Sequence, residues 1–400
     1  MIYKLEHLFN SALMFIFLVC TAGNYPAYQY GIFGAALAYY YLYLLLMNST
    51  VLEPMQILIA KKYSGSYIGE IFLIVVKLSI VTWLVANLLA FIFLKFAMVS
   101  GGDYLLIFSI LIAALFNAQI QIVRRVVLAQ KNVRYLIGIA AWNFLSLILS
   151  LILMIYNEIS ILSVFLFWQI LSGTVCFIWL LLQVNNRRRK KIIIEPIKGV
   201  FYRYALRNLP LTPFSWFFGN FPFIFGPSLF GAEALADYRK TINFTGPILQ
   251  YFSITGIMFL SKSAKLNNVS LGFAYIFDSV RKRLLVISLF TIFMMIIWPY
   301  IASIESGLWR YLPSKENIPS LFFASIVYVY VESINYLVGS NYRANQLTFP
   351  LTIMSVAPCI LLCLCVLINS PTSPAELVLN SAAISAFVLF FSIYYVRVKK

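Results

Sequence analysis

Long apolar blocks alternate with short polar segments along the whole chain. Each block is long enough to cross about 30 Å of hydrocarbon as a helix. The blocks fall at residues 8–24, 32–60, 71–97, 104–128, 135–156, 160–184, 209–230, 242–261, 284–303, 319–340, 348–369 and 376–396. This pattern predicts an all-α polytopic membrane protein with about 12 transmembrane helices. The first block is the weakest span, because it is short and begins beside Glu6 and His7.

Every second polar segment is rich in lysine and arginine. Because successive polar segments lie on alternate sides of the membrane, about 24 of the 30 basic residues lie on one side. Loops rich in basic residues stay in the cytoplasm, so we expect both termini to be cytoplasmic.

The basic run "NNRRRKKIIIEPIKG" at residues 185–199 leaves six apolar blocks on each side. We therefore expect an N-terminal six-helix lobe at 1–186, a basic cytoplasmic linker at 187–208 and a C-terminal six-helix lobe at 209–400. An even number of spans gives both lobes the same orientation, as in parallel repeats. The linker is either a solvated loop beside anionic lipid or a docking segment for a specific partner.

Composition narrows the classes of function. The chain is 62% hydrophobic and 11% charged, whereas a soluble domain carries roughly 25% charged residues. The net charge of +17 lies between apolar blocks, which argues against nucleic acid as a partner. A single histidine, the lack of a phosphate-binding loop and five cysteines within apolar blocks argue against a catalytic site, a metal centre or a cofactor. The protein must then act between its helices.

Two carboxylates inside apolar blocks are candidates for ion coupling. Glu332 lies about 18 Å from the outer end of its block, near the bilayer centre, where a charge costs at least ~2.5 kcal/mol. It is either a protonated residue bonded to a neighbouring helix or a cavity residue that binds substrate or the coupling ion, H⁺ or Na⁺. Glu53 precedes Pro54 within "TVLEPMQILIAKK" and is either an interfacial residue at a kink or a second coupling candidate.

Three basic residues are candidates for contacts with an anionic substrate. Lys77 sits inside "IFLIVVKLSIVTWL" and either snorkels to the membrane surface or faces the inner mouth of a cavity. Arg239 and Lys240 are expected to open the block at 242–261 on the outer side. There they either contact a head group or act as ordinary interface residues.

Aromatic residues in the second block are candidates for lining a cavity. Tyr39 and Tyr43 lie within "AYYYLYLLLM", and Tyr43 is too deep for an interfacial belt. A buried phenol needs a hydrogen-bond partner, which either a polar cavity or helix packing would supply. The block at 209–230 contains four prolines, so we expect it to bend and interpret it as a moving element.

One segment carries a family resemblance. "YQYGIFGAALAYYYLYLLLMNSTVLEPMQILIAKKYSG" resembles the second-helix region of the polysaccharide-export branch of the multidrug/oligosaccharidyl-lipid/polysaccharide (MOP) superfamily, whose members include Wzx-type O-antigen flippases. Tyr30, Gly31, Phe33 and Gly34 match, as does the Ile-Ala-Lys at 59–61. The segment at 229–250 is a weaker match. The chain departs from the family at Asn48 and Thr50, where an acidic residue and a glycine are frequent, and at 244–245, where a basic residue is frequent.

The resemblance implies a flippase that moves an undecaprenyl-diphosphate-linked oligosaccharide across a bacterial inner membrane. Two six-helix lobes would rock around a central cavity lined by cationic, aromatic and polar groups. The implied partners are the lipid-linked oligosaccharide, membrane lipids, and the polymerase and chain-length proteins of surface-polysaccharide synthesis.

Other functions remain open at this point. A polytopic O-antigen polymerase would be expected to carry a large outer loop, and the longest one here, about 304–318, is short. A MATE-like small-molecule exporter would be expected to carry an acidic cation site in its N-terminal lobe, and the middle of the first block has no acidic residue. A peptidoglycan lipid flippase or another polysaccharide exporter would share the features described above.

Overall fold

In the computed structural model, the described part of the chain is helical. The described residues are 2–55, 68–96, 103–129, 133–156, 159–187, 208–245, 269–278, 318–345 and 347–398, together with 199, 202, 206, 259, 280, 281, 288 and 289. Most of the expected blocks at 284–303 and 242–261 and most of the linker at 187–208 lie outside them.

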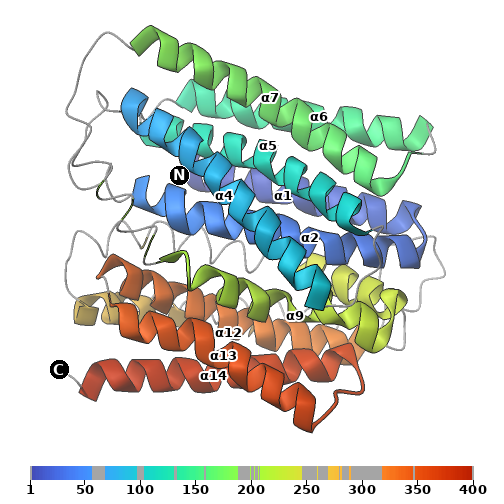
Figure 1. Cartoon of the computed structure of the whole chain (residues 1–400), viewed down its shortest axis with the longest axis vertical. Helices are drawn as coiled ribbons and strands as arrows, with labels where there is room; N and C mark the ends of the chain where they lie inside the picture. Colours follow the sequence, from blue (N-terminus) through green and yellow to red (C-terminus); the bar gives the residue numbers. More distant parts are fainter. Residues whose placement is uncertain are drawn as a thin grey trace. The chain divides into compact units, whose positions relative to one another are not determined.

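Hydrophobic block boundaries and helix boundaries agree within a few residues for most spans. The long helices are α1 (Ile2–Asn24), α2 (Ala27–Met47), α4 (Ile68–Phe96), α5 (Asp103–Ala129), α6 (Val133–Tyr156), α7 (Ile161–Arg187), α9 (Thr212–Phe230), α12 (Ile318–Ala344), α13 (Thr348–Ile368) and α14 (Pro374–Val398) (Figure 1). Eight helices in the described ranges are long and apolar enough to cross a membrane. The protein is therefore an all-helical, multi-pass membrane protein.

The chain divides into two compact units that do not follow the chain order. Unit 1 consists of Met1–Leu13 and Phe33–Ser228, and unit 2 consists of Met14–Ile32 and Leu229–Lys400. Helices α1 and α2 thus each contribute one part to unit 1 and the other part to unit 2. The predicted division into lobes at 187–208 stays a prediction.

Unit 1 contains α4, α5, α6, α7 and α9. Helix α5 packs against α7, and α6 also packs against α7. The indole Nε1 of Trp216 on α9 donates to the carbonyl oxygen of Ala38 at 2.6 Å, which fixes α9 on α2. Helix α9 is continuous although Pro222 and Pro227 lie inside it, so its proposed motion stays a prediction.

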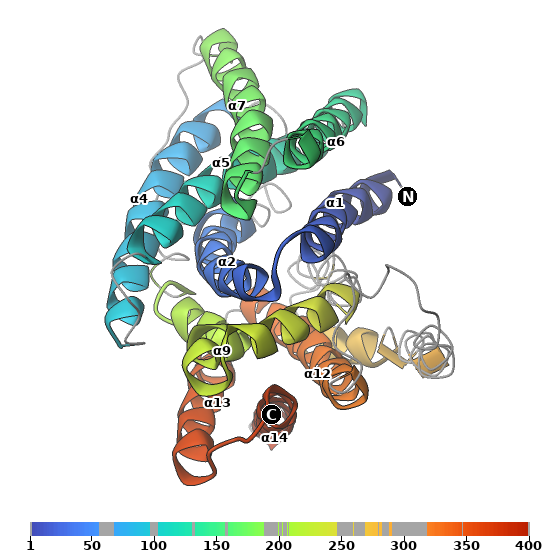
Figure 2. The ribbon, with the colours of Figure 1, turned by 90° about the vertical axis from the view of Figure 1, so that its right-hand side faces the viewer.

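Unit 2 contains α12, α13 and α14, and Figure 2 shows α14 beside α12 and α13. A further helical stretch covers residues 232–245. It begins about three turns earlier than the block at 242–261 predicts, because the left-handed φ of 83° at Gly231 ends α9 and the helix-forming run "AEALADYRK" follows at once. Arg239 and Lys240 therefore lie inside this helix and do not open it.

Candidate functional site

The end of α2 is a π-helical bulge at Asn48–Leu52. Pro54 follows it and has no amide hydrogen to donate to the preceding turn, which favours a local rearrangement of the backbone. The backbone N–H of Glu53 donates to the carbonyl oxygen of Asn48, five residues back. Bulges of this kind occur frequently at functional sites.

Side chains from α5 hold this bulge. Arg125 donates from Nη2 to Asn48 Oδ1 at 2.7 Å and from Nη1 to the carbonyl oxygen of Leu52 at 3.5 Å. Asn48 Nδ2 in turn donates to Glu53 Oε1 at 3.2 Å. Glu53 and Arg125 are 3% and 7% exposed. We call Asn48, Glu53 and Arg125 the bulge cluster.

The bulge also directs hydroxyl groups toward two other helices. Ser49 Oγ shares a hydrogen bond of 2.8 Å with Thr212 Oγ1 at the start of α9. Thr50 Oγ1 lies 3.3 Å from Thr82 Oγ1 on α4. The irregular turn thus connects α2 with α4, α5 and α9 inside unit 1.

A polar row on α5 continues from the arginines toward α7. Arg124 Nη1 donates to Gln121 Oε1 at 3.0 Å, Gln121 lies 3.5 Å from Asn117 Oδ1, and Asn117 Nδ2 donates to Gln169 Oε1 at 2.8 Å. Arg124 is buried. Counting basic residues by side assigns this arginine pair to the cytoplasmic surface, so the sequence reasoning missed their burial. The signal that could have revealed it was a row of polar residues, Asn117, Gln121 and Arg124, spaced four and three positions apart within an apolar block.

The two tyrosine candidates pack between helices of unit 1. Tyr43 is fully buried, and its phenol donates to the backbone carbonyl of Ser79 on α4 at 3.2 Å. The ring of Tyr39 lies 5.6 Å from that of Trp216 on α9. Both placements favour the helix-packing alternative, and a contact of either residue with substrate stays a prediction.

Lys77 lies on the exposed face of α4. Its side chain is exposed, and Val81, Leu84 and Leu88 extend the same face at spacings of four, three and four residues. Those three apolar side chains are 54%, 57% and 60% exposed. A lysine in line with such residues favours the snorkelling alternative.

In unit 2, Glu332 lies near the middle of α12, within the span Ser320–Ala344. Ser385 of α14 donates a short hydrogen bond from Oγ to Glu332 Oε1, and Asn335 Nδ2 donates to the same oxygen at 3.1 Å. Asn335 Nδ2 also contacts Ser385 Oγ, while Asn335 Oδ1 is buried with no hydrogen-bond partner among the described residues. We call Glu332, Asn335 and Ser385 the Glu332 cluster.

The surroundings of this cluster are neutral. Among the described residues, the carboxylate of Glu332 accepts from the Ser385 hydroxyl and the Asn335 amide, and Tyr328 lies four residues earlier on the same helix. Next to it lies Asn335 Oδ1, a buried amide oxygen with no hydrogen-bond donor among the described residues. A carboxylate with neutral partners beside such an oxygen can take up a proton or help to hold a small hard cation.

Arg239 and Lys240, the basic residues predicted on the outer side of the membrane, differ in burial. Arg239 is 4% exposed and Lys240 is half-buried, and both lie in the helical residues 232–245 of unit 2. No group of three or more His, Cys, Asp and Glu residues in the described ranges could hold a metal ion.

No family model matches the chain, and no curated protein matches it by sequence. Among solved structures, lipid II flippase MurJ in an inward closed conformation has a TM-score of 0.67 at 14% identity, with 99% of this chain and 87% of that chain covered. The eukaryotic MATE transporter AtDTX14 has a TM-score of 0.65 at 13% identity, with 98% and 93% covered.

A third similar structure is a MOP superfamily transporter from Pyrococcus furiosus, for which reverse polarity of the binding pocket suggests a different function. It has a TM-score of 0.66 at 10% identity, with 100% of this chain and 94% of that chain covered. These three proteins are transporters and not enzymes. Likeness at such low identity concerns the fold, and the chain has the fold of the MOP superfamily transporters.

Proposed function

We propose that the chain is a flippase for a polyprenyl-diphosphate-linked oligosaccharide in a bacterial inner membrane. The lipid tail stays in the bilayer while the diphosphate and sugars cross between two rocking six-helix lobes. The fold supports transport as the class of function, and the match at Tyr30, Gly31, Phe33 and Gly34 supports this branch.

The observation that carries the substrate class is the balance of buried charge. Among the described residues, the side chains of Arg124, Arg125, Arg239 and Glu53 are buried, and the Glu332 carboxyl is enclosed although part of that residue is exposed. Three arginines against two carboxylates suit an anionic head group, because guanidinium groups bind phosphate oxygens in a bidentate manner. An exporter of cationic small molecules would be expected to show the opposite balance.

The Glu332 cluster supports ion coupling. Its carboxylate lies at mid-helix depth and has only neutral partners among the described residues. Such a group is costly to keep in a membrane unless it exchanges an ion or a proton. We therefore assign the coupling role to Glu332 and a structural role to Glu53, which lies beside an arginine-held backbone.

The deciding experiment is complementation of a flippase-null strain that makes the cognate lipid-linked repeat unit. The wild-type chain should restore surface polysaccharide, and Glu332→Gln should lower it at least tenfold at equal protein level, because the amide cannot exchange a proton or charge. Glu233→Gln is the matched control, since Glu233 is exposed in the same unit.

Failure of the wild-type chain to restore polysaccharide, together with raised resistance to cationic drugs, would replace the flippase with a MATE-like exporter. Full activity of Glu332→Gln would remove the coupling role and leave the flippase assignment in place.

A further inference from the structure

The motif that carries the family resemblance lies where α2 passes from one unit into the other. Tyr30 and Gly31 belong to unit 2, and Phe33 belongs to unit 1. Phe33 packs edge-on against Phe165 of α7, with ring centroids 5.5 Å apart. The four-residue motif is thus anchored on both sides of the boundary between Ile32 and Phe33.

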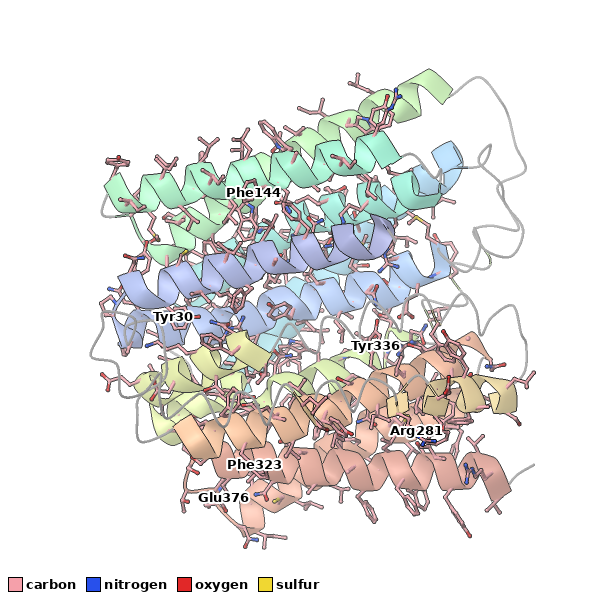
Figure 3. All side chains as sticks on the ribbon, turned by 180° about the vertical axis from the view of Figure 1, so that it is seen from behind. Tyr30, Phe144, Arg281, Phe323, Tyr336 and Glu376 are labelled. Atoms are coloured by element: carbon pink, nitrogen blue, oxygen red, sulfur yellow. The ribbon has the colours of Figure 1, made fainter. Side chains whose placement is uncertain are left out.

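Tyr30 ties three chain segments of unit 2 together. Its phenol donates to the backbone carbonyl of Leu18 on α1 at 3.2 Å and accepts from Nδ2 of Asn243 at 2.6 Å. The ring of Phe15 meets that of Phe244 at 6.1 Å. Tyr30 is fully buried, and Figure 3 labels it within the α1–α2 hairpin.

Gly31 allows the backbones to approach. A Cβ atom at this position would overlap the backbone carbonyl of Ala232, the residue directly after the left-handed Gly231. The hairpin residues 14–32 therefore meet the start of helix 232–245 at Gly31 and its later turns at Tyr30.

The hydrogen bonding of this contact is incomplete. Asn243 is 5% exposed, and its Oδ1 has no hydrogen-bond partner among the described residues. By contrast, Asn143 in unit 1 accepts from Trp168 Nε1 and Ser172 Oγ and donates to Asn10 of α1 at 3.0 Å. A permanent buried network normally satisfies its polar atoms, so an unpaired buried acceptor marks a contact with an alternative arrangement.

We propose that Leu18, Tyr30 and Asn243, with Gly31 against Ala232, form a releasable latch that holds the α1–α2 hairpin on unit 2. The Asn10–Asn143 contact keeps the other end of α1 on unit 1 throughout. The inference rests on the proposed function in one respect, since release of the latch is a step of the transport cycle.

The test measures the hairpin itself and needs no substrate. Spin labels at Ala27→Cys and Phe323→Cys, both exposed positions of unit 2, report the distance between hairpin and α12 in a chain whose five cysteines are replaced. Figure 3 labels Phe323 on α12. We expect one dominant distance in the otherwise wild-type chain in lipid nanodiscs.

Tyr30→Phe removes the phenol oxygen and with it both hydrogen bonds of the latch, so it should raise the population at a second distance at least fivefold, the effect of a single buried hydrogen bond. Asn243→Leu removes one of these two bonds and should raise that population less, and the double variant should match Tyr30→Phe because both bonds pass through the phenol. Tyr28→Phe, at a 58% exposed tyrosine two residues earlier on the same helix, should leave the distances unchanged.

An unchanged distance distribution in both Tyr30→Phe and Asn243→Leu overturns the latch, as does an equal shift in Tyr28→Phe. Gly31→Ala provides an independent variant that should also populate the second distance while the hydrogen bonds stay available. If the variants shift the distance but the wild-type chain fails to complement, the flippase assignment is wrong and the latch stands. If the wild-type chain complements but the variants cause no shift, the latch is wrong and the flippase assignment stands.

Discussion

The bulge cluster of unit 1 and the Glu332 cluster of unit 2 each combine a carboxylate with an asparagine inside an apolar span. They differ in one respect that decides their chemistry. Arg125 is linked to Glu53 through Asn48, whereas the partners of Glu332 in the described ranges are neutral. The arginine-held arrangement fixes the backbone around its carboxylate, whereas hydroxyl and amide partners place no fixed counter-charge beside theirs.

The two clusters also differ in the regularity of the backbone that carries them. The bulge cluster sits on a π-helical turn whose side chains contact three other helices. Glu332 sits on a regular helix, and its hydrogen bonds within the described ranges are to Asn335 of the same helix and Ser385 of α14. Loss of a bulge-cluster residue should therefore affect folding first, and loss of a Glu332-cluster residue should affect transport first.

The largest expected effect on stability is that of Arg125→Met. It leaves the buried Asn48 Oδ1 and the Leu52 carbonyl oxygen without their donor from α5, which should cost about 3 kcal/mol. Unfolding by dodecyl sulfate in mixed micelles measures this loss. Arg134→Met, at an exposed residue of α6, should lower the free energy of unfolding only slightly. Equal losses for Arg125→Met and Arg134→Met would show that Arg125 has no special role in stability.

Asn48→Ala should be next, because it breaks both hydrogen bonds of the bulge cluster but leaves the two charges present. We expect a loss of about 2 kcal/mol in the same assay. The control is Asn87→Ala on α4, whose side chain donates to the carbonyl of Trp83 in its own helix. A loss no greater than that of the control would show that the bulge does not depend on Asn48.

Ser385→Ala tests the other cluster. It removes one neutral donor from Glu332, so the fold should lose about 1 kcal/mol while flipping activity falls roughly fivefold. Ser381→Ala on the same helix removes a hydroxyl that donates only to the carbonyl of Leu377 and should leave activity unchanged. A larger change in stability than in activity would make the Glu332 cluster structural.

The smallest effect belongs to Lys77→Gln. A snorkelling lysine on the exposed face of α4 should change stability by less than about 0.5 kcal/mol and leave flipping unchanged. Moving the charge deeper along that face with Leu84→Lys should cost about 2 kcal/mol. A loss of flipping in Lys77→Gln without loss of protein would restore the alternative in which Lys77 contacts substrate.

Sequence patterns predicted the spans well because hydrophobic length is a local property. The helices at 68–96, 103–129 and 348–368 begin and end within three residues of the apolar blocks. The start of the helix at 232 was missed, since a positive φ at one glycine set that boundary and "AEALADYRK" is not apolar. The prediction of a disturbed backbone at Pro54 is consistent with the bulge, although its π-helical form was not predictable.

Side-chain partners were harder to predict because they depend on contacts distant in sequence. The carbonyl of Ser79 supplies the hydrogen bond that Tyr43 needs, and no pattern around residue 43 points to it. Arg124 and Arg125 were assigned to the surface because counting charges by side treats every arginine as solvated. Glu332 was recognised from depth alone, and Ser385 as its partner required the packing of α14 on α12.

The division of α1 and α2 between the units has a consequence for biosynthesis. Residues 14–32 leave the ribosome early, but the rest of unit 2 begins only at Leu229. The hairpin therefore waits in the membrane while residues 33–228 are synthesised, and its surface for helix 232–245 stays covered by lipid or by the insertion machinery meanwhile. Chains truncated after α7 should accordingly be recognised by membrane quality control as unfinished, however well unit 1 has packed.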